Sequence, residues 1–224
     1  MKTGIIVAMQ AELDHLLHSM QDRREISIDG VTLHTGTVGA HSVAAMQCGI
    51  GKVNAAIGAL TLIKAFNPDM IINTGIAGGT GSGAGILDVV VADEVAYHDV
   101  WCGPGNVRGQ VQGFPARFSC AAGNAMLPAL ASIPSLRRGL VASGDMFVDT
   151  PEELARILSL HPDAIAVDME SGAIAQVCHR QGVPFAMIRV VSDYPGADNH
   201  IDQYLNFWND APAATFDVLK KCLA

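Results

Sequence analysis

The chain carries a series of short apolar runs, several of which do not alternate with polar residues. They lie at 4–8, 42–47, 70–73, 88–92, 139–142, 164–167 and 185–191. A strand that is covered on both faces has this composition, because neither row of its side chains meets water. Such strands are typical of parallel sheets with helices packed on both sides.

Helical patterns fill the intervals between these runs. Apolar residues recur at helical spacing in Lys52–Phe66, Pro151–Leu160 and Ser171–Gln181, and a final helix is expected over 201–223. The alternation predicts an α/β fold, a three-layer sandwich with a central mixed, largely parallel sheet flanked by helices. No linker, low-complexity tract or internal repeat is visible, so residues 1–224 are expected to form a single domain.

Charge and composition argue against several classes of partner. The 224-residue chain has a formal net charge of −8 at pH 7 and no run of Lys or Arg, whereas nucleic acids and anionic membranes attract a cationic surface. The first residues lack the pattern of a signal peptide, and no segment approaches the roughly eighteen apolar residues of a membrane span. The cysteines are widely spaced and form no CxxC pair, which indicates reduced thiols in a cytoplasmic protein.

Two glycine-rich stretches resemble nucleotide-binding loops but lack essential parts of them. CGIGKVNAAIG at 48–58 has no Ser or Thr after Lys52 to bind Mg²⁺. TGIAGGTGSGAG at 74–85 precedes another strand-like run, not the helix that would hold a pyrophosphate. We expect these glycines to bring the backbone close to an uncharged part of a ligand. The histidines show neither HxH nor HExxH spacing, so no metal site is predicted.

Acidic residues follow several of the predicted strands. Glu12 comes after the first run, Asp168 and Glu170 follow a later one, and Asp193 ends the run that contains Arg189. Glu12 alone would be an ordinary solvated acid in a first helical turn, but the carboxyl ends of parallel strands meet at one edge, where ligands bind. Within its strand Arg189 needs a carboxylate partner, with Glu170 or Glu12 as candidates. Converging acids without a metal pattern indicate acid–base chemistry on a polyhydroxyl substrate.

Several segments that include these acids resemble the bacterial 5′-methylthioadenosine/S-adenosylhomocysteine nucleosidases of the purine nucleoside phosphorylase superfamily. The segments are IIVAMQAE (5–12), CGIGKV (48–53), NTGIAGG (73–79), YHDV (97–100), ASGDMFV (142–148), AVDMESGAIAQVC (166–178) and RVVSD (189–193). They keep the order of the family and span nearly the whole chain. The resemblance implies a cytoplasmic homodimer without a cofactor. It would hydrolyse the N-glycosidic bond of methylthioadenosine, S-adenosylhomocysteine and 5′-deoxyadenosine, releasing adenine and a 5′-substituted ribose.

The resemblance also implies roles for the charged residues. Glu12 would be the general base that activates water, and Asp193 the general acid at the purine N7. Glu170 would bind the ribose hydroxyls, with Met169 against the sugar and Arg189 helping to place Glu170 and the water. This assignment agrees with the chemistry, since glycosidic cleavage builds positive charge on the ribose and negative charge on the leaving base.

The remaining contacts implied by the resemblance surround the base and the ribose. Phe147 would stack on the purine, and the main chain of Val148 would read its Watson–Crick edge. Ser192 would support the general acid, while Ala77 and Gly78 would lie along the ribose and base.

The 5′ end of the substrate is expected in an apolar pocket. Met9 and Ile50 could form it together with an aromatic lid residue, for which both Tyr204 and Phe207 qualify.

The chain departs from the family pattern at three places. Asp168 stands where many relatives have Glu, and Ile76 where serine is frequent. The stretch 99–115, DVWCGPGNVRGQVQGFP, differs in length and content from the family; it is expected to be a long loop anchored by Trp101 and Phe114.

Three alternatives share parts of the pattern. A hydrolase of another purine nucleoside, such as a futalosine-type compound, would use the same carboxylates. A nucleoside phosphorylase would need a cation near the first strand, but GIIVAMQAELD (4–14) has an acid at Glu12 and no Arg or Lys. A non-catalytic nucleoside-binding protein would have no use for Glu12 and Asp193.

Overall fold

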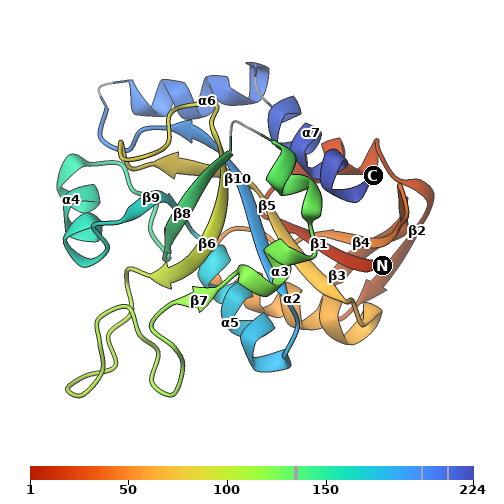
Figure 1. The fold of residues 1–224 in the computed structure, drawn as a ribbon, viewed down its shortest axis with the longest axis horizontal. Helices are drawn as coiled ribbons and strands as arrows, with labels where there is room; N and C mark the ends of the chain where they lie inside the picture. Colours follow the sequence, from red (N-terminus) through yellow and green to blue (C-terminus); the bar gives the residue numbers. More distant parts are fainter. Residues whose placement is uncertain (134–135, 198, 211) are drawn as a thin grey trace.

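A computed structural model gives the fold and describes residues 1–133, 136–197, 199–210 and 212–224 (Figure 1). The strands are β1 (Lys2–Val7), β2 (Gln21–Ile28), β3 (Val31–Val38), β4 (His41–Gln47), β5 (Met70–Gly79), β6 (Val89–Tyr97), β7 (Phe118–Ser119), β8 (Leu136–Ser143), β9 (Ala164–Asp168) and β10 (Phe185–Asp193). The helices are α1 (Gln10–Leu17), α2 (Lys52–Phe66), α3 (Ala121–Ala125), the 3₁₀ turn η1 (Pro128–Ser132), α4 (Pro151–Leu160), α5 (Ser171–Gln181), α6 (His200–Asp210) and α7 (Pro212–Leu223).

One mixed sheet runs through the described chain in the order β10-β6-β8-β9-β5-β1-β4-β3-β2. β1 pairs in parallel with β4 and β5, β5 pairs in parallel with β10, and β8 does so with both β6 and β9. The contacts of β10 with β6 and of β5 with β9 are antiparallel, and they close β5, β10, β6, β8 and β9 into a ring. The expected mixed α/β sheet is therefore confirmed, with a closure that was not predicted.

Helices cover the sheet on two sides, as the three-layer prediction requires (Figure 1). β1 illustrates the arrangement, because Ile5 and Val7 belong to a core with α1 and α7, while Ile6 belongs to a second core with α2 and α5. All three side chains are fully buried. The absence of polar alternation in this run thus reflects burial on both faces.

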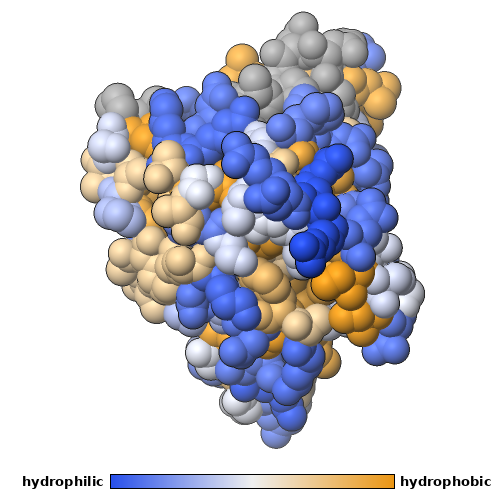
Figure 2. Space-filling model, turned by 90° about the vertical axis from the view of Figure 1, so that its right-hand side faces the viewer, coloured by the Kyte–Doolittle hydropathy of each residue, from blue (hydrophilic) through white to orange (hydrophobic). Residues whose placement is uncertain are grey.

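The hairpin of β2 and β3 was not predicted, although it carries a turn signal. Asp29-Gly30 joins the strands, and both residues have positive φ, 51° and 81°, as a two-residue hairpin turn requires. β2 forms the edge of the sheet and is exposed along most of its length. Figure 2 views this side of the molecule, where hydrophilic side chains cover much of the surface. Charged residues on such an edge oppose pairing with another chain.

Several predicted boundaries were wrong; the run at 88–92, for example, continues as β6 to Tyr97. β5 does not end at residue 73 but continues through the glycines to Gly79, where it pairs with β9 and β10. The final helix is two helices, α6 and α7, and residue 211 between them lies outside the described residues. α7 begins at Pro212, which has no backbone N–H to continue a preceding helix. In the described part of the chain, no helix combines the length and apolarity of a bilayer span.

The predicted long loop lies between β6 and β7 and extends away from the body of the molecule (Figure 1). Phe114 anchors it as expected, since its ring packs near Phe118 and His179 with centroids 6.5 and 6.1 Å away. The prediction for Trp101 was wrong: this residue is 48% exposed, and Arg108 of the same loop lies over its ring.

Candidate active site

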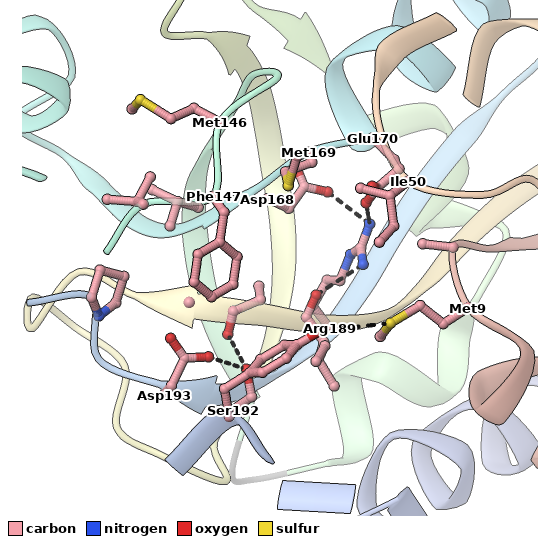
Figure 3. Close-up of a pocket in the computed structure, with 18 of the residues that line it drawn as sticks. Met9, Ile50, Met146, Phe147, Asp168, Met169, Glu170, Arg189, Ser192 and Asp193 are labelled. Carbon is pink, nitrogen blue, oxygen red and sulfur yellow. Dashed lines mark hydrogen bonds and ion pairs between the residues drawn. The ribbon is translucent and has the colours of Figure 1, made fainter. Parts of the chain in front are cut away.

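The carboxyl ends of β1, β5, β9 and β10 open onto one cavity (Figure 3). β9 runs antiparallel to β5, so the expectation of a single parallel edge was wrong. The closure of the sheet brings the ends together, with Gly78 paired to Val167. All predicted site residues line this cavity: Met9, Glu12, Ile50, Ala77, Gly78, Phe147, Val148, Met169, Glu170, Arg189, Ser192 and Asp193.

Glu12 lies in the first turn of α1 and is 1% exposed, so it is not the solvated acid that this position alone would indicate. Its Oε2 accepts hydrogen bonds from the backbone N–H groups of Ala8 and Met9, both at 2.9 Å, and Oε1 accepts from Ile76 at 3.2 Å. Burial raises the pKa of Glu12 despite the opposing effects of Arg189 and these N–H groups. The result is a rigidly held carboxylate with an increased affinity for a proton.

Gly75 makes room for Glu12. Its φ is +143°, and a Cβ at this position would overlap the carboxylate of Glu12. Gly75→Ala is therefore expected to displace Glu12. If Glu12 is the general base that the sequence predicts, kcat should fall by about 100-fold. Gly81→Ala is the matched control, because Gly81 also has positive φ (+77°) but a Cβ added there would meet no atom within 4 Å. Steady-state kinetics of both variants would contradict the expectation if their kcat values were equal.

Arg189 is the centre of a buried charge cluster. It is 1% exposed, and its Nη2 lies 2.7 Å from Asp168 Oδ2 and 3.3 Å from Glu170 Oε2. Nη2 also donates to Asn73 Oδ1, and Nη1 donates to the carbonyl of Ile76. The predicted partner Glu170 is confirmed, but Asp168 is nearer. Glu12, the other candidate, binds backbone N–H groups instead.

The two acids of this cluster differ in their other contacts. Asp168 accepts hydrogen bonds from the backbone N–H and the hydroxyl of Ser171, at 3.0 and 2.7 Å, and so ties the start of α5 to Arg189. Glu170 Oε1 accepts from the backbone N–H of Gly51 at 3.0 Å. Burial raises the pKa of Glu170 to about 7, against the effect of Arg189. Both acids line the cavity, but Asp168 supports Arg189 and the start of α5, whereas Glu170 is held by Arg189 and the start of α2.

Asp193 lies on the opposite side of the cavity from this cluster in the view of Figure 3. Ser192 Oγ donates to its Oδ1, and Nε2 of His200 lies 2.8 Å from its Oδ2. Burial raises the pKa of Asp193, although Ser192 and His200 oppose the shift. The carboxyl group therefore favours the protonated form more than an exposed aspartate does.

Aromatic and apolar side chains line the cavity between the charged groups. Phe147 projects between Asp193 and the Arg189 cluster and is 44% exposed (Figure 3). Tyr204 of α6 lines the cavity, and its hydroxyl donates to Met9 Sδ at 3.7 Å. Phe207 is instead buried in the core with α7. Of the two aromatic residues considered for the lid, the structure places Tyr204 at the cavity.

Some lining residues were not predicted as site residues. Ala8, Met146, Val167 and Pro195 contribute apolar surface, and Ile76 and Asp168 also line the cavity. His200 contacts Asp193 from outside the lining. It is seven positions beyond Asp193 at the start of a helix, and no spacing rule relates a histidine there to the acid. Within the described residues, no group of three His, Cys, Asp or Glu side chains is placed to hold a metal ion.

Comparison with known proteins identifies the family. The model described as the phosphorylase superfamily matches residues 2–224, so the chain belongs to this superfamily. Among solved structures, the MTA/SAH nucleosidase of Streptococcus pneumoniae in complex with 8-aminoadenine is 36% identical, with a TM-score of 0.93 and coverage of 100% of this chain and 99% of that chain.

Two further solved structures are similar to this chain at lower sequence identity. The 5′-methylthioadenosine/S-adenosylhomocysteine nucleosidase of Neisseria meningitidis in complex with methylthio-immucillin-A is 34% identical, with a TM-score of 0.92 and coverage of 99% and 97%. A futalosine hydrolase mutant of Helicobacter pylori is 26% identical, with a TM-score of 0.90 and coverage of 99% and 97%. The resemblance to the MTA/SAH nucleosidases that the sequence indicated is therefore confirmed.

Proposed function

We propose that this protein hydrolyses the N-glycosidic bond of 5′-methylthioadenosine and S-adenosylhomocysteine, and of 5′-deoxyadenosine, releasing adenine and a 5′-substituted ribose. The observation that carries the proposal is one apolar cavity with carboxyl groups on two sides. Glu12 and Glu170 stand on one side and Asp193 on the other, and burial raises the pKa of each. This arrangement suits a reaction in which one side activates water and the other protonates the leaving group.

In the proposed mechanism, the bond between C1′ and N9 breaks and its electron pair moves into the purine. Asp193 donates a proton to N7, which makes adenine a better leaving group. The oxygen of water bonds to C1′, and its proton passes to Glu12. Glu170 accepts hydrogen bonds from the ribose hydroxyls, and the negative charge of the carboxylates stabilises the positive charge that develops on the sugar.

The apolar residues are proposed to position the substrate. Phe147 stacks on the base and the main chain of Val148 contacts its edge. Ala77 and Gly78 of β5 lie along the base and ribose, and Met169 packs against the sugar. A thioalkyl group at the 5′ end meets a predominantly apolar surface, to which Met9, Ile50 and Tyr204 contribute.

Charge supports water over phosphate as the nucleophile. Among the described residues that line the cavity, Arg189 is the one Lys or Arg side chain, and Asp168 and Glu170 already hold it. The start of α2, where a phosphate could otherwise bind, donates its N–H groups to protein carboxylates. The backbone N–H of Gly51 donates to Glu170, and the backbone N–H of Lys52 donates to Asp145. A phosphate dianion would meet mostly negative charge.

One assay tests the proposal. The purified protein is incubated with methylthioadenosine, S-adenosylhomocysteine, inosine and futalosine, each with and without phosphate, and release of the free base is followed. We expect phosphate-independent release of adenine from the first two. A requirement for phosphate would contradict hydrolysis, and base release from futalosine alone would favour the second candidate, which the similarity to the Helicobacter pylori protein supports.

A homodimer is proposed on the basis of α2. Val53, Ile57 and Leu60 share one face of this helix and are 68%, 53% and 41% exposed, an apolar surface that a second copy of the chain would cover. Ile50, 52% exposed, extends this surface to the cavity. Sedimentation equilibrium should therefore give twice the chain mass, and a monomer would contradict the proposal. We also propose that residues 1–224 form a single domain, since one family model matches residues 2–224. A cytoplasmic location is proposed because all five cysteines are free thiols.

A further inference from the structure

His200 contacts two groups of the proposed site without lining the cavity itself. It is the first residue of α6 and is 3% exposed. Its Nε2 lies 2.8 Å from Oδ2 of Asp193. The face of the same ring stacks on Phe147, with centroids 5.3 Å apart and planes inclined by 22°.

The contacts of Asp193 explain what this arrangement achieves. A free carboxyl group turns about its Cβ–Cγ bond, but here Ser192 engages Oδ1 and His200 engages Oδ2. The start of α6 is itself fixed to the end of β10, because the backbone N–H of Tyr194 donates to Oε1 of Gln203 at 3.1 Å. His200 is therefore held at a defined position behind the acid.

We propose that His200 is a positioning residue for the general acid, resting on the function proposed above. In the structure Nε2 lies 2.8 Å from Oδ2 without the alignment of a hydrogen bond. When the imidazole turns toward the acid, its Nε2–H donates to Oδ2 of Asp193 and fixes the orientation in which the carboxyl group meets the base. Its ring face supports Phe147, so that one imidazole sets the acid and the stacking surface relative to each other. The two contacts use different parts of the ring, the edge for Asp193 and the face for Phe147, and can be removed separately.

Two substitutions separate these contacts. His200→Phe keeps a flat ring against Phe147 but removes the donor. We expect kcat for methylthioadenosine to fall about 10- to 100-fold, the range for losing a hydrogen bond to an ionisable group, while KM changes little. His200→Gln keeps an N–H donor but removes the ring. It should retain most of kcat and raise KM, because Phe147 loses its support.

A substrate whose leaving group needs no proton distinguishes positioning of the acid from a general structural role. With 4-nitrophenyl 5-methylthio-β-ribofuranoside, nitrophenolate departs unaided, and His200→Phe should remain within about threefold of the wild type, as should Asp193→Asn. Equal losses on both substrates, or undiminished kcat on methylthioadenosine, would overturn the proposal. So would a loss of kcat in His200→Gln as large as that in His200→Phe.

A second measurement does not depend on turnover. In ¹⁵N-histidine-labelled protein, the Nε2–H of His200, assigned by its loss in His200→Phe, should give a hydrogen-bonded resonance that moves upfield in Asp193→Ala. Absence of this resonance, or its insensitivity to Asp193→Ala, would overturn the proposal even if the wild type hydrolysed none of the nucleosides. Failure of adenine release by the wild type would instead count against the proposed function.

Discussion

Glu12→Gln is expected to lower kcat by about 100-fold or more while the fold survives, since a glutamine cannot accept the proton of the attacking water. The substitution keeps the size of the side chain and an oxygen to accept the backbone hydrogen bonds of Ala8 and Met9. Steady-state kinetics with methylthioadenosine and a thermal melt measure the two effects.

Asp14→Asn is the matched control, because it removes an acid from the same helix at an exposed position. It should change kcat by less than about twofold, as surface substitutions away from a site do. If Glu12→Gln behaves like this control, Glu12 is not the base.

The pH profile gives a second check on Glu12. A general base acts in its deprotonated form, and burial raises the pKa of Glu12 above its ordinary value of 4.5. The rate of the wild type should therefore fall as the pH decreases through this raised pKa, at a higher pH than an exposed glutamate would produce. Asp193 acts in its protonated form, so the rate should also fall as the pH rises above the pKa of this acid. A pH-independent rate would contradict both assignments.

The sequence predicted the buried strands and the residues of the cavity more accurately than the order in which the strands pair in the sheet. Runs such as 185–191 have no polar alternation because β10 is buried along its whole length. The acids that follow these strands were recognised from their positions and from the family motifs. Apolar runs without alternation and short family motifs both consist of residues that are adjacent in the chain, so they can be recognised in a single sequence.

Two of the features that were missed depend on residues far apart in the chain. The closure of the sheet follows from the pairing of Gly78 with Val167, which no local pattern indicates. The choice of Asp168 over Glu12 as a partner of Arg189 is likewise set by the pairing of β5 with both β9 and β10. Trp101 was assigned to anchor its loop because large aromatic residues are usually buried, but here Arg108 covers the ring at the surface. In the first two cases, packing between distant segments decided between local alternatives, and at Trp101 a neighbour in the same loop did.

Among the substitutions considered, Arg189→Met should cause the largest decrease in the free energy of unfolding. Arg189→Met leaves Asp168 and Glu170 in the interior without their cation, and removal of one member of a buried ion pair costs about 3–5 kcal/mol in free energy of unfolding. Arg117→Met is the matched control. Arg117 makes a two-point contact with Asp163 at 2.6 and 2.9 Å, but the two side chains are 34% and 54% exposed. An exposed pair contributes about 0–1 kcal/mol, so the control should lose far less.

The pH dependence of this loss identifies its cause. Burial already raises the pKa of Glu170 to about 7, and removal of the cation makes the folded protein bind protons still more readily at this cluster. A carboxyl group whose pKa is higher in the folded than in the unfolded state stabilises the protein at low pH, and this stabilisation is lost as the pH rises through the folded-state pKa. The deficit of Arg189→Met in urea denaturation should therefore shrink as the pH falls from neutral into the ordinary carboxyl range. A deficit that does not vary with pH would indicate lost packing around the guanidinium stem, and a deficit no larger than that of Arg117→Met would show that the buried acids do not depend on Arg189.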